Sequence, residues 1–414
     1  MTLISSPVII DTDPGIDDAL ALYLALASPQ LDIKAITVVY GNSSIKDTTR
    51  NLITLFDVID KEIEYFKNAS PPNNDLHPEE WERERRILLN RFEWSKPVVA
   101  IGADKPMKAT EHLAVDFHGL DGFGQIHTTH PHYTPKDLKN LKSNRYVMSS
   151  QDAIDEILTQ LKNAPPFTIT IIALGPLTNL ALAYKKDKRT FSRVKQIICL
   201  GGAINSHGNT TPCAEFNFYA DPHAANIISE ATKGFSPLIT VQNKIERLRR
   251  RDLVPLHFTV LPINVSCSFL LSSKDFTNYV TSLNTPLSIF MTAFMDYAFN
   301  KMRNYYGVYS LEMHDPVAVA FAIDILSNKS LAYTSEYVDM KIETQGIYTR
   351  GMTIVDSRPK PPSLDLNKSK TLERDFGIWS HLYATNVEVI TSYDYKLFIG
   401  DFLKRVFNVD LFEY

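Results

Sequence analysis

Short runs of β-branched and other apolar residues alternate with stretches of helical character along the first half of the chain. Three of these runs end in a polar or glycine-containing turn that leads into such a stretch: "PVIIDTDPGIDD" before "ALALYLALA", "IKAITVVYGNSS" before "IKDTTRNLITLFDVI", and "FTITIIALGPLTN" before "LALAYKK". A fourth run, "VKQIICLGGAIN", comes next. In the second helical stretch Ile45, Leu52, Phe56 and Ile59 share one face, which predicts an amphipathic helix.

A further helix is predicted at "SSQDAIDEILTQLK", where the apolar residues recur at helical spacing after a serine N-cap. Pro176 is expected at the first position of the helix that follows the third apolar run. Continuous apolar strands that alternate with helices are typical of parallel sheets buried on both faces. The sequence therefore predicts an α/β fold with a single open, mostly parallel, Rossmann-like sheet and helices on both faces.

Four segments interrupt this alternation. They are polar, turn-rich or charged, and we interpret them as surface insertions of one domain that spans 1–414. The insertions lie near 61–96, 127–148, 236–252 and 358–375. Towards the end of the chain, "YVDMKIET" and "MTIVDSR" flank a turn at Gly346 and predict a small antiparallel addition, and a last helix is expected around Tyr395–Phe407.

Composition excludes several classes of protein. With 43 basic and 47 acidic residues, the chain has no overall field that would recruit nucleic acid or a membrane, so neither is an expected partner. Three cysteines cannot form a closed set of disulfides, which favours a reducing, cytoplasmic or nuclear compartment. The first residues lead straight into the first strand and are not expected to form a signal peptide, and no stretch is long and apolar enough for a membrane helix.

Polar residues gather directly after the apolar runs, where the carboxyl ends of parallel strands converge and ligands bind. The first run gives Asp11, Asp13, Asp17 and Asp18, the second Asn42, the third Leu174 and Gly175, and the fourth leads to "GNTTPCAEFNFYADP"; "EMHDPVAVAFAID" adds His314 and Asp315. This set is rich in carboxylates and amides and almost free of Lys and Arg. Crowded carboxylates suit a hard cation such as Ca²⁺, and the remaining carboxylates and amides suit the hydroxyl groups of a sugar.

The same segments resemble a known family, the inosine-uridine preferring nucleoside hydrolases. The opening "DTDPGIDDALAL" is close to that family's signature, and "VVYGN", "HGLDGFG", "ALGPLTNLA", "LGGAINSHGNTTPCAEFNFYADPHAA", "HDPVAVA" and "YTRGMTIVD" follow in the family's order. Together these blocks cover most of the chain outside the insertions.

The resemblance implies a ligand set for a tightly bound Ca²⁺ ion, made of Asp13, Asp18, Asp315 and the main-chain carbonyl of Leu174. It also implies residues that bind the substrate. Those expected on the ribose are Asp17, Asn42, Asn209, Glu215 and Asn217, and those expected near the base are His118, His314 and, by a looser match, Tyr305 and Tyr306. Asp11 is left to orient the loop.

The implied activity is Ca²⁺-dependent hydrolysis of the N-glycosidic bond of ribonucleosides to ribose and free base. Such cleavage passes through a transition state with positive charge on the sugar. The ion would hold the attacking water and the ribose hydroxyls, Asp13 would take the proton from that water, and His314, or His118, would assist the departing base. Homo-oligomers, dimers or tetramers, are common in the family and are expected here.

The sequence also leaves alternatives open. The substrate could be another N-ribosyl compound such as nicotinamide riboside, or the chain could be a non-catalytic nucleoside-binding relative. A family block that usually reads "LDVTH" is "INVSC" here, with Asn264 in place of an aspartate. The "HTTHPH" segment lacks the spacing of a zinc site, and "RLRRR" is interpreted as an exposed loop in preference to a site for nucleic acid or acidic lipid. A phosphatase with a "DTD" motif is excluded by Pro14-Gly15.

Overall fold

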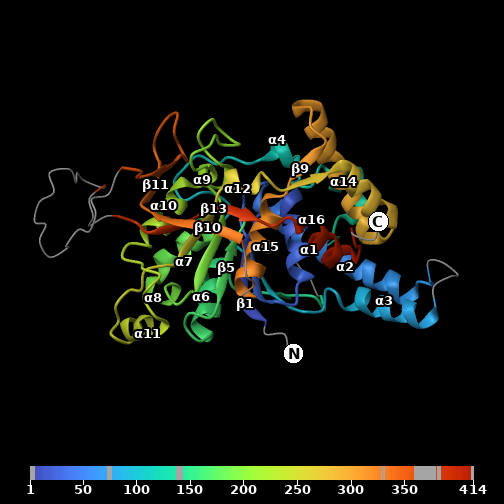
Figure 1. Ribbon diagram of the computed structural model, residues 1–414, viewed down its shortest axis with the longest axis horizontal. Helices are drawn as coiled ribbons and strands as arrows, with labels where there is room; N and C mark the ends of the chain where they lie inside the picture. Colours follow the sequence, from blue (N-terminus) through green and yellow to red (C-terminus); the bar gives the residue numbers. More distant parts are fainter. Residues whose placement is uncertain are drawn as a thin grey trace, which may run out of the picture.

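The apolar runs form the central sheet of the protein. The computed structural model describes residues 5–71, 77–136, 143–327, 329, 332–358, 379 and 384–411. Within these residues nine strands form one sheet across the middle of the molecule (Figure 1). In order across the sheet they are β10 (Ala332–Val338), β13 (Val387–Asp394), β7 (Phe258–Leu261), β6 (Gln196–Leu200), β5 (Thr170–Ala173), β1 (Ser6–Thr12), β2 (Leu31–Val38), β3 (Val98–Ile101) and β4 (Val147–Met148). All neighbours are parallel except β10 and β13, so the predicted open, mostly parallel sheet is confirmed.

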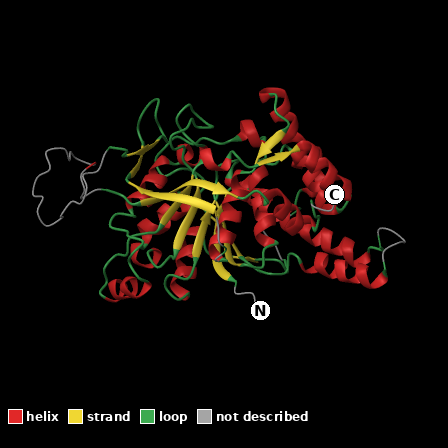
Figure 2. Ribbon diagram, in the orientation of Figure 1, coloured by secondary structure: helices red, strands yellow, loops and turns green. Residues whose placement is uncertain are grey.

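Helices cover both faces of this sheet, as predicted. Along β1, Val8 and Ile10 join one apolar cluster and Ile9 joins the other, because successive side chains of a strand point to opposite faces. The first cluster is covered by α1 (Ile16–Leu26), α2 (Ile45–Asn68), α14 (Pro286–Lys301), α15 (His314–Leu326) and α16 (Phe398–Phe407). The second is covered by α6 (Ala153–Asn163), α7 (Thr178–Lys186), α8 (Lys188–Phe191) and α10 (Pro222–Glu230). Figure 2 shows the strands enclosed between these two groups of helices.

Shorter elements connect this framework. The remaining helices are α3 (Pro78–Asn90), α4 (Val115–His118), α5 (Ile126–Thr129), α9 (Phe216–Ala220), α11 (Val241–Arg249), α12 (Ile263–Ser266) and α13 (Ser273–Tyr279), with short turns η1 (Pro131–Tyr133), η2 (Thr281–Leu283) and the π-helical η3 (Met302–Tyr306). Two small antiparallel pairs complete the described part: β8 (Leu270–Ser272) with β9 (Ser310–Glu312), and β11 (Met340–Ile342) with β12 (Thr353–Val355). The second pair is the predicted C-terminal addition.

Two local predictions about helix starts were wrong. The N-cap of α6 is Asp152, whose side chain accepts a hydrogen bond from the Asp155 amide, so the serines that precede it do not cap the helix. Pro176 lies two residues before α7, which begins at Thr178. Its carbonyl accepts a hydrogen bond from the Thr178 amide in a tight turn, and this turn carries the chain from β5 into the helix.

The segments predicted as insertions contain more regular structure than their polarity suggested. Residues 61–96 hold the end of α2 and all of α3, with Trp81 buried against Phe66 and Leu88. Residues 127–148 hold most of α5, η1 and β4, and residues 236–252 hold α11. The "RLRRR" run therefore lies at the end of a helix and not in a loop. The predicted insertion at 358–375 lies outside the described residues apart from Arg358.

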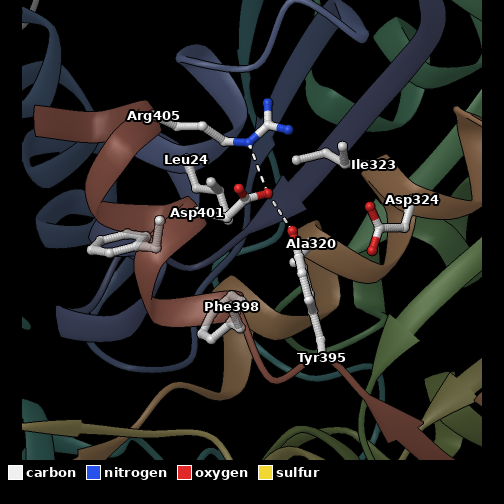
Figure 3. A pocket seen from close by; sticks show the side chains of 9 residues that line it. Leu24, Ala320, Ile323, Asp324, Tyr395, Phe398, Asp401 and Arg405 are labelled. Atoms are coloured by element: carbon white, nitrogen blue, oxygen red, sulfur yellow. Dashed lines mark hydrogen bonds and ion pairs between the residues drawn. The ribbon is translucent and has the colours of Figure 1, made fainter. Parts of the chain in front are cut away.

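The C-terminal helix α16 starts three residues later than predicted, at Phe398, and docks beside α1 and α15. A small cavity of about 10 Å³ lies at this junction, and Figure 3 shows the side chains that line it. Asp401 accepts a hydrogen bond from the hydroxyl of Tyr395, and its Oδ2 lies 3.7 Å from Nε of Arg405. A space of this size holds about one water molecule. The cavity is thus a packing feature of the helix junction. No helix in the described part of the chain is long and apolar enough to cross a membrane.

Candidate active site

The carboxyl ends of the parallel strands bring together most of the polar residues singled out in the sequence. Asp13 follows β1, Asn42 follows β2 and Leu174 follows β5. The amide of Asn42 donates to Oδ2 of Asp13 at 2.8 Å, which joins the first two strand ends directly. The third strand end is linked to Asn217, because the side chain of that residue donates a hydrogen bond to the carbonyl of Leu174 at 2.7 Å.

Asp18 is the most heavily bonded carboxylate of the first motif. It accepts hydrogen bonds from the hydroxyl of Thr12, from the amide of Gly15 at 3.0 Å and from Nδ2 of Asn42 at 2.7 Å. The residue lies in the first turn of α1, where the helix dipole favours negative charge. Burial nevertheless raises the pKa of Asp18, because it removes the charged form of the side chain from solvent.

In the folded protein the carboxylate of Asp13 lies between Gly41 and Gly175. A Cβ atom at Gly41 would lie 2.0 Å from Oδ2 of Asp13, and one at Gly175 would lie 2.4 Å from Oδ1. Any larger residue at either position would displace the carboxylate. Burial, with the neighbouring charge of Asp18, raises the pKa of Asp13 well above its ordinary value.

Three carboxylates gather closely enough to hold a metal ion. Asp17, Asp18 and Asp315 each offer an oxygen, and these oxygens lie within 4.8 Å of one another. Oδ1 of Asp17 is buried and has no hydrogen-bond partner. Burial and the charge of Asp18 raise the pKa of Asp17 to about 7, and burial and the neighbouring aspartates raise the pKa of Asp315 well above its usual range. A bound cation would fit this site, because it would give the Asp17 oxygen a partner and would neutralise the charge of the three crowded carboxylates.

This gathering differs in two respects from the predicted ligand set. Asp18 and Asp315 belong to it, but the third member is Asp17 and not Asp13, whose carboxylate is directed at Gly41, Asn42 and Gly175. The Leu174 carbonyl, also predicted as a ligand, accepts the Asn217 side chain. In the described residues no further group of His, Cys, Asp and Glu, including the "HTTHPH" histidines, forms a comparable cluster.

Two of the residues expected on the ribose are fixed by main-chain contacts of their own. Glu215 is the N-cap of α9 and accepts hydrogen bonds from the amides of Gly202, Asn217 and Phe218. Asn209 lies on an exposed loop, where its side chain accepts from the amide of Phe216 at 2.9 Å. Asn209 therefore lies next to Glu215 in structure but outside the buried cluster.

The two candidate histidines lie in different environments. Nδ1 of His118 accepts a hydrogen bond from the Ile16 amide at 3.1 Å, and its Nε2 lies 4.0 Å from Oδ1 of Asp17. Burial lowers the pKa of His118 to about 3, so this ring is neutral. His118 belongs to α4 and contacts the first residue of α1 through this hydrogen bond, so its neutral Nε2–H group lies beside Asp17.

His314 is held at both ring nitrogens. Nδ1 lies 2.8 Å from the hydroxyl of Ser266, and Nε2 lies 3.0 Å from a carboxylate oxygen of Glu312. Burial opposes protonation, but the hydrogen bond with Glu312 and the charge of Asp17 outweigh it and raise the pKa of His314. Neither Ser266 nor Glu312 was singled out from the sequence. Ser266 lies in the "INVSC" block, so the departure of that block from the family pattern marked the right segment but not the residue.

Tyr305 and Tyr306 lie at the surface of the protein. They lie in η3 with 78% and 65% of their surface exposed, and the ammonium group of Lys301 lies 5.5 Å from the Tyr305 ring centre. Asp11, whose role was left open, accepts hydrogen bonds from Thr37 and from Asn179. It links β1 to β2 and to α7, beneath the site.

Comparison with known proteins agrees with these motifs. A family model described as inosine-uridine preferring nucleoside hydrolase matches residues 8–400. Uridine nucleosidase 1 of Arabidopsis thaliana is 32% identical over 352 residues, 84% of this chain and 81% of that protein. The inosine-uridine preferring nucleoside hydrolase of Leishmania major is 28% identical over 372 residues, 89% of this chain and 93% of that protein.

Solved structures give the same result for the fold. A plant nucleoside hydrolase is 27% identical, with a TM-score of 0.67, over 97% of this chain and 98% of that one. A purine-preferring ribonucleoside hydrolase from Gardnerella vaginalis shares the fold at 23% identity and a TM-score of 0.65, over 97% of this chain and 98% of that one. The chain therefore belongs to the inosine-uridine preferring nucleoside hydrolase family and is an N-glycosidase that hydrolyses ribonucleosides.

Proposed function

We propose that this protein hydrolyses uridine- and inosine-type ribonucleosides in a Ca²⁺-dependent reaction that yields ribose and free base. The observation that carries the proposal is the group of Asp17, Asp18 and Asp315, whose oxygens lie within 4.8 Å of one another beside His314. Oxygen ligands from carboxylates are those that Ca²⁺ prefers. When bound, the ion would supply a template for the ribose hydroxyls and acidify a water molecule.

The ligands proposed for this ion are Asp13, Asp18, Asp315 and the Leu174 carbonyl, with Asp17 close enough to share in the site. Asp13 comes from the turn between β1 and α1, Asp18 from the first turn of α1, and Asp315 from the first turn of α15. Asp13 is supported as the general base by its place at the end of β1, where its buried carboxylate lies among the polar groups of the site and accepts the Asn42 amide at 2.8 Å.

Ribose is proposed to lie against Asp17, Asn42, Asn209, Glu215 and Asn217. Negative and amide groups on the sugar would stabilise the positive charge that develops at the anomeric carbon. Asn42 and Asn217 each have donors that now bond to oxygens of the site, to Asp18 and to Leu174. Asn42 therefore already faces a carboxylate of the cluster, whereas Asn217 faces the main-chain carbonyls of Leu174 and Leu200.

The departing base is proposed to be assisted by His314, with His118 as a neutral contact and with Tyr305 and Tyr306 close to the base. His314 supports the acid role better than His118, because its pKa is raised while that of His118 is lowered to about 3. In the described geometry both nitrogens of His314 are engaged, so Glu312 or Ser266 must yield to the base before a proton is transferred.

A substrate panel tests this proposal. Uridine, inosine and nicotinamide riboside are incubated with the protein in Ca²⁺, and base release is followed by the change in absorbance. We expect turnover of the first two. Faster cleavage of nicotinamide riboside would redirect the proposal to another N-ribosyl substrate, and binding without any turnover would leave a nucleoside-binding protein.

We further propose that the protein is a homo-oligomer, dimer or tetramer, of a reducing compartment, cytoplasmic or nuclear. The cysteines Cys199, Cys213 and Cys267 are all free, which supports the compartment. Ile347 and Tyr348, which are 92% and 88% exposed, offer an apolar contact for a second copy. Light scattering of the purified protein measures the mass of the assembly directly.

A further inference from the structure

One strongly charged surface has no part in the nucleoside site. The second half of α11 and the turn after it expose four arginines, Arg247, Arg249, Arg250 and Arg251. In the described part of the chain no carboxylate forms an ion pair with any of these four side chains. Arg251 also has a φ of 67°, in the left-handed region where glycine is favoured at the end of a helix. Arg251 therefore adopts a backbone conformation that glycine would adopt with less strain.

A second basic segment lies directly beside the first. Nη2 of Arg189, in α8, donates to the carbonyl of Leu248 in α11 at 3.0 Å, and this bond holds the two helices together. Segments 185–189 and 244–252 contain nine Lys and Arg against three Asp and Glu, in a chain with a net charge of −4. The rest of the protein is therefore acidic, and positive charge is concentrated here. We call these two segments the basic face.

Aliphatic side chains flank the basic face. Leu238 is 88% exposed, Val241 is 54% exposed and Leu253 is 49% exposed. They do not belong to a loose segment, because Leu248 between them is buried with Phe167 in a small apolar cluster. This combination suits the surface of an anionic membrane. Arginine side chains would contact the headgroups, and the exposed aliphatic side chains would enter the hydrocarbon layer beneath them.

A nucleic acid is a weaker match to the same surface. Proteins that bind single-stranded nucleic acid combine positive charge with exposed aromatic rings on which the bases stack. None of the large exposed apolar residues flanking α11 in the described structure is aromatic: they are Leu238, Val241 and Leu253. The side chains next to the arginines can enter a lipid layer but cannot stack on bases.

The position of the basic face leaves the nucleoside site free. The chain passes from α11 into the amino end of β7, whereas the site lies at the carboxyl ends of the strands. In Figure 1, α8 and α11 lie at the lower left, and α4, α9 and α12 lie in the upper middle of the molecule. We propose that the basic face docks the protein reversibly on membranes with anionic headgroups, with the nucleoside site directed away from the lipid.

Vesicle co-sedimentation tests this proposal on the full-length, Ca²⁺-loaded protein. Vesicles of phosphatidylcholine with phosphatidylserine are compared with vesicles of phosphatidylcholine alone, at low and at high salt. We expect binding only to the anionic vesicles, and its loss at high salt because exposed charges are screened. The double variant R249Q/R250Q should reduce the affinity about 10–30-fold. The variant Leu238→Ser should also weaken binding while leaving its salt dependence in place.

A matched control separates the basic face from net charge. R83Q/R86Q removes two exposed arginines from α3 and changes the net charge equally, so it should bind as the parent does. Base release from nucleosides should be unchanged in all of these variants. The proposal is overturned if the parent does not bind anionic vesicles at low salt, or if R249Q/R250Q binds them with the same affinity as the parent. Binding to a homopolymeric RNA without binding to vesicles would likewise overturn it and assign the basic face to nucleic acid.

Discussion

The buried ion pair between Arg91 and Glu62 gives the sharpest prediction about stability. The side chain of Glu62 is 1% exposed and that of Arg91 is 5% exposed. Glu62 also accepts hydrogen bonds from the hydroxyl of Thr285 at 3.0 Å and from the amide of Leu287 at 2.8 Å. It therefore binds the end of α2 to Arg91 and to the first turn of α14. The proposed change is Arg91→Met, which keeps an unbranched apolar stem and removes the charged guanidinium group.

The magnitude follows from the contacts that remain. Removing one partner of a buried pair leaves the other charge unpaired and costs about 3–5 kcal/mol. Glu62 would keep its two donors in α14 and the favourable dipole of that helix, which is worth about 0.3–1 kcal/mol. We therefore expect Arg91→Met to lower the free energy of unfolding by about 3 kcal/mol. The double variant R91M/E62Q should recover part of this loss, because no charge is then buried.

Urea unfolding followed by tryptophan fluorescence measures this cost. Trp81 is buried in the same helical hairpin and reports on it directly. Lys67→Met is the control, since Lys67 and Glu64 form an exposed pair at 3.8 Å that is worth less than about 1 kcal/mol. A cost below about 1 kcal/mol for Arg91→Met would refute the reasoning. It would mean that water reaches Glu62 in the variant.

Three further predictions concern the site and its surroundings. A Cβ atom at Gly175 would lie 2.4 Å from Oδ1 of Asp13, so Gly175→Ala should displace that carboxylate and lower kcat for uridine about 10²-fold; an unchanged kcat in a folded variant would argue against Asp13 as the base. Asp315→Asn should raise the melting temperature of the Ca²⁺-free protein, by relieving repulsion, and abolish the stabilisation by Ca²⁺, about 2.7 kcal/mol at 100 times Kd in the parent; calorimetry would contradict this if the variant still responded to Ca²⁺. Burial lowers the pKa of His127 from 6.5 to about 4, and Nε2 of the ring is bonded to Asn51 at 2.9 Å. The unfolded chain thus binds a proton that the folded chain excludes, so stability should fall by about 1–2 kcal/mol as the pH drops from about 6.5 to about 4; His127→Gln should flatten this slope in urea titrations, and an equal slope in both proteins would contradict the assignment.

Strands β1, β2, β5 and β6 were readable from the sequence because each is a continuous apolar run that leads into a turn. The shorter or more polar strands β3, β4, β7 and β10 were not singled out. The sequence did not predict strand β13, which is the second strand from one edge of the sheet. Its residues, Val387–Asp394, follow a long polar segment and pair with β7 and β10, which are far away in sequence. Helix α3 was hidden in a charged segment, because only Trp81 and Leu88 of its 13 residues are buried. Their burial depends on Phe66 of α2, so the apolar face appears only when the two helices pack.

The candidate site also contains some residues that the sequence predicted and others that it did not. Residues of the motifs at the ends of strands, such as Asp18 and Asp315, were expected to meet and do meet. The two groups that hold His314 were not expected. Ser266 comes from α12 and Glu312 from β9, and neither has a distinctive local sequence. The position of a carboxylate within the cluster also depends on packing. The glycines around Asp13 direct its oxygens, and this direction is fixed only in the folded protein.

Removal and return of Ca²⁺ is the most direct test of the proposed function. The protein is stripped with a chelator, dialysed into metal-free buffer, and assayed for base release from uridine and inosine before and after Ca²⁺ is added back. The cluster of Asp17, Asp18 and Asp315 predicts that turnover disappears on stripping and returns with Ca²⁺ in the parent, and that it does not return in the Asp315→Asn variant. Full turnover by the stripped protein, with metal content verified by elemental analysis, would contradict a role for the cluster as the metal site of the reaction.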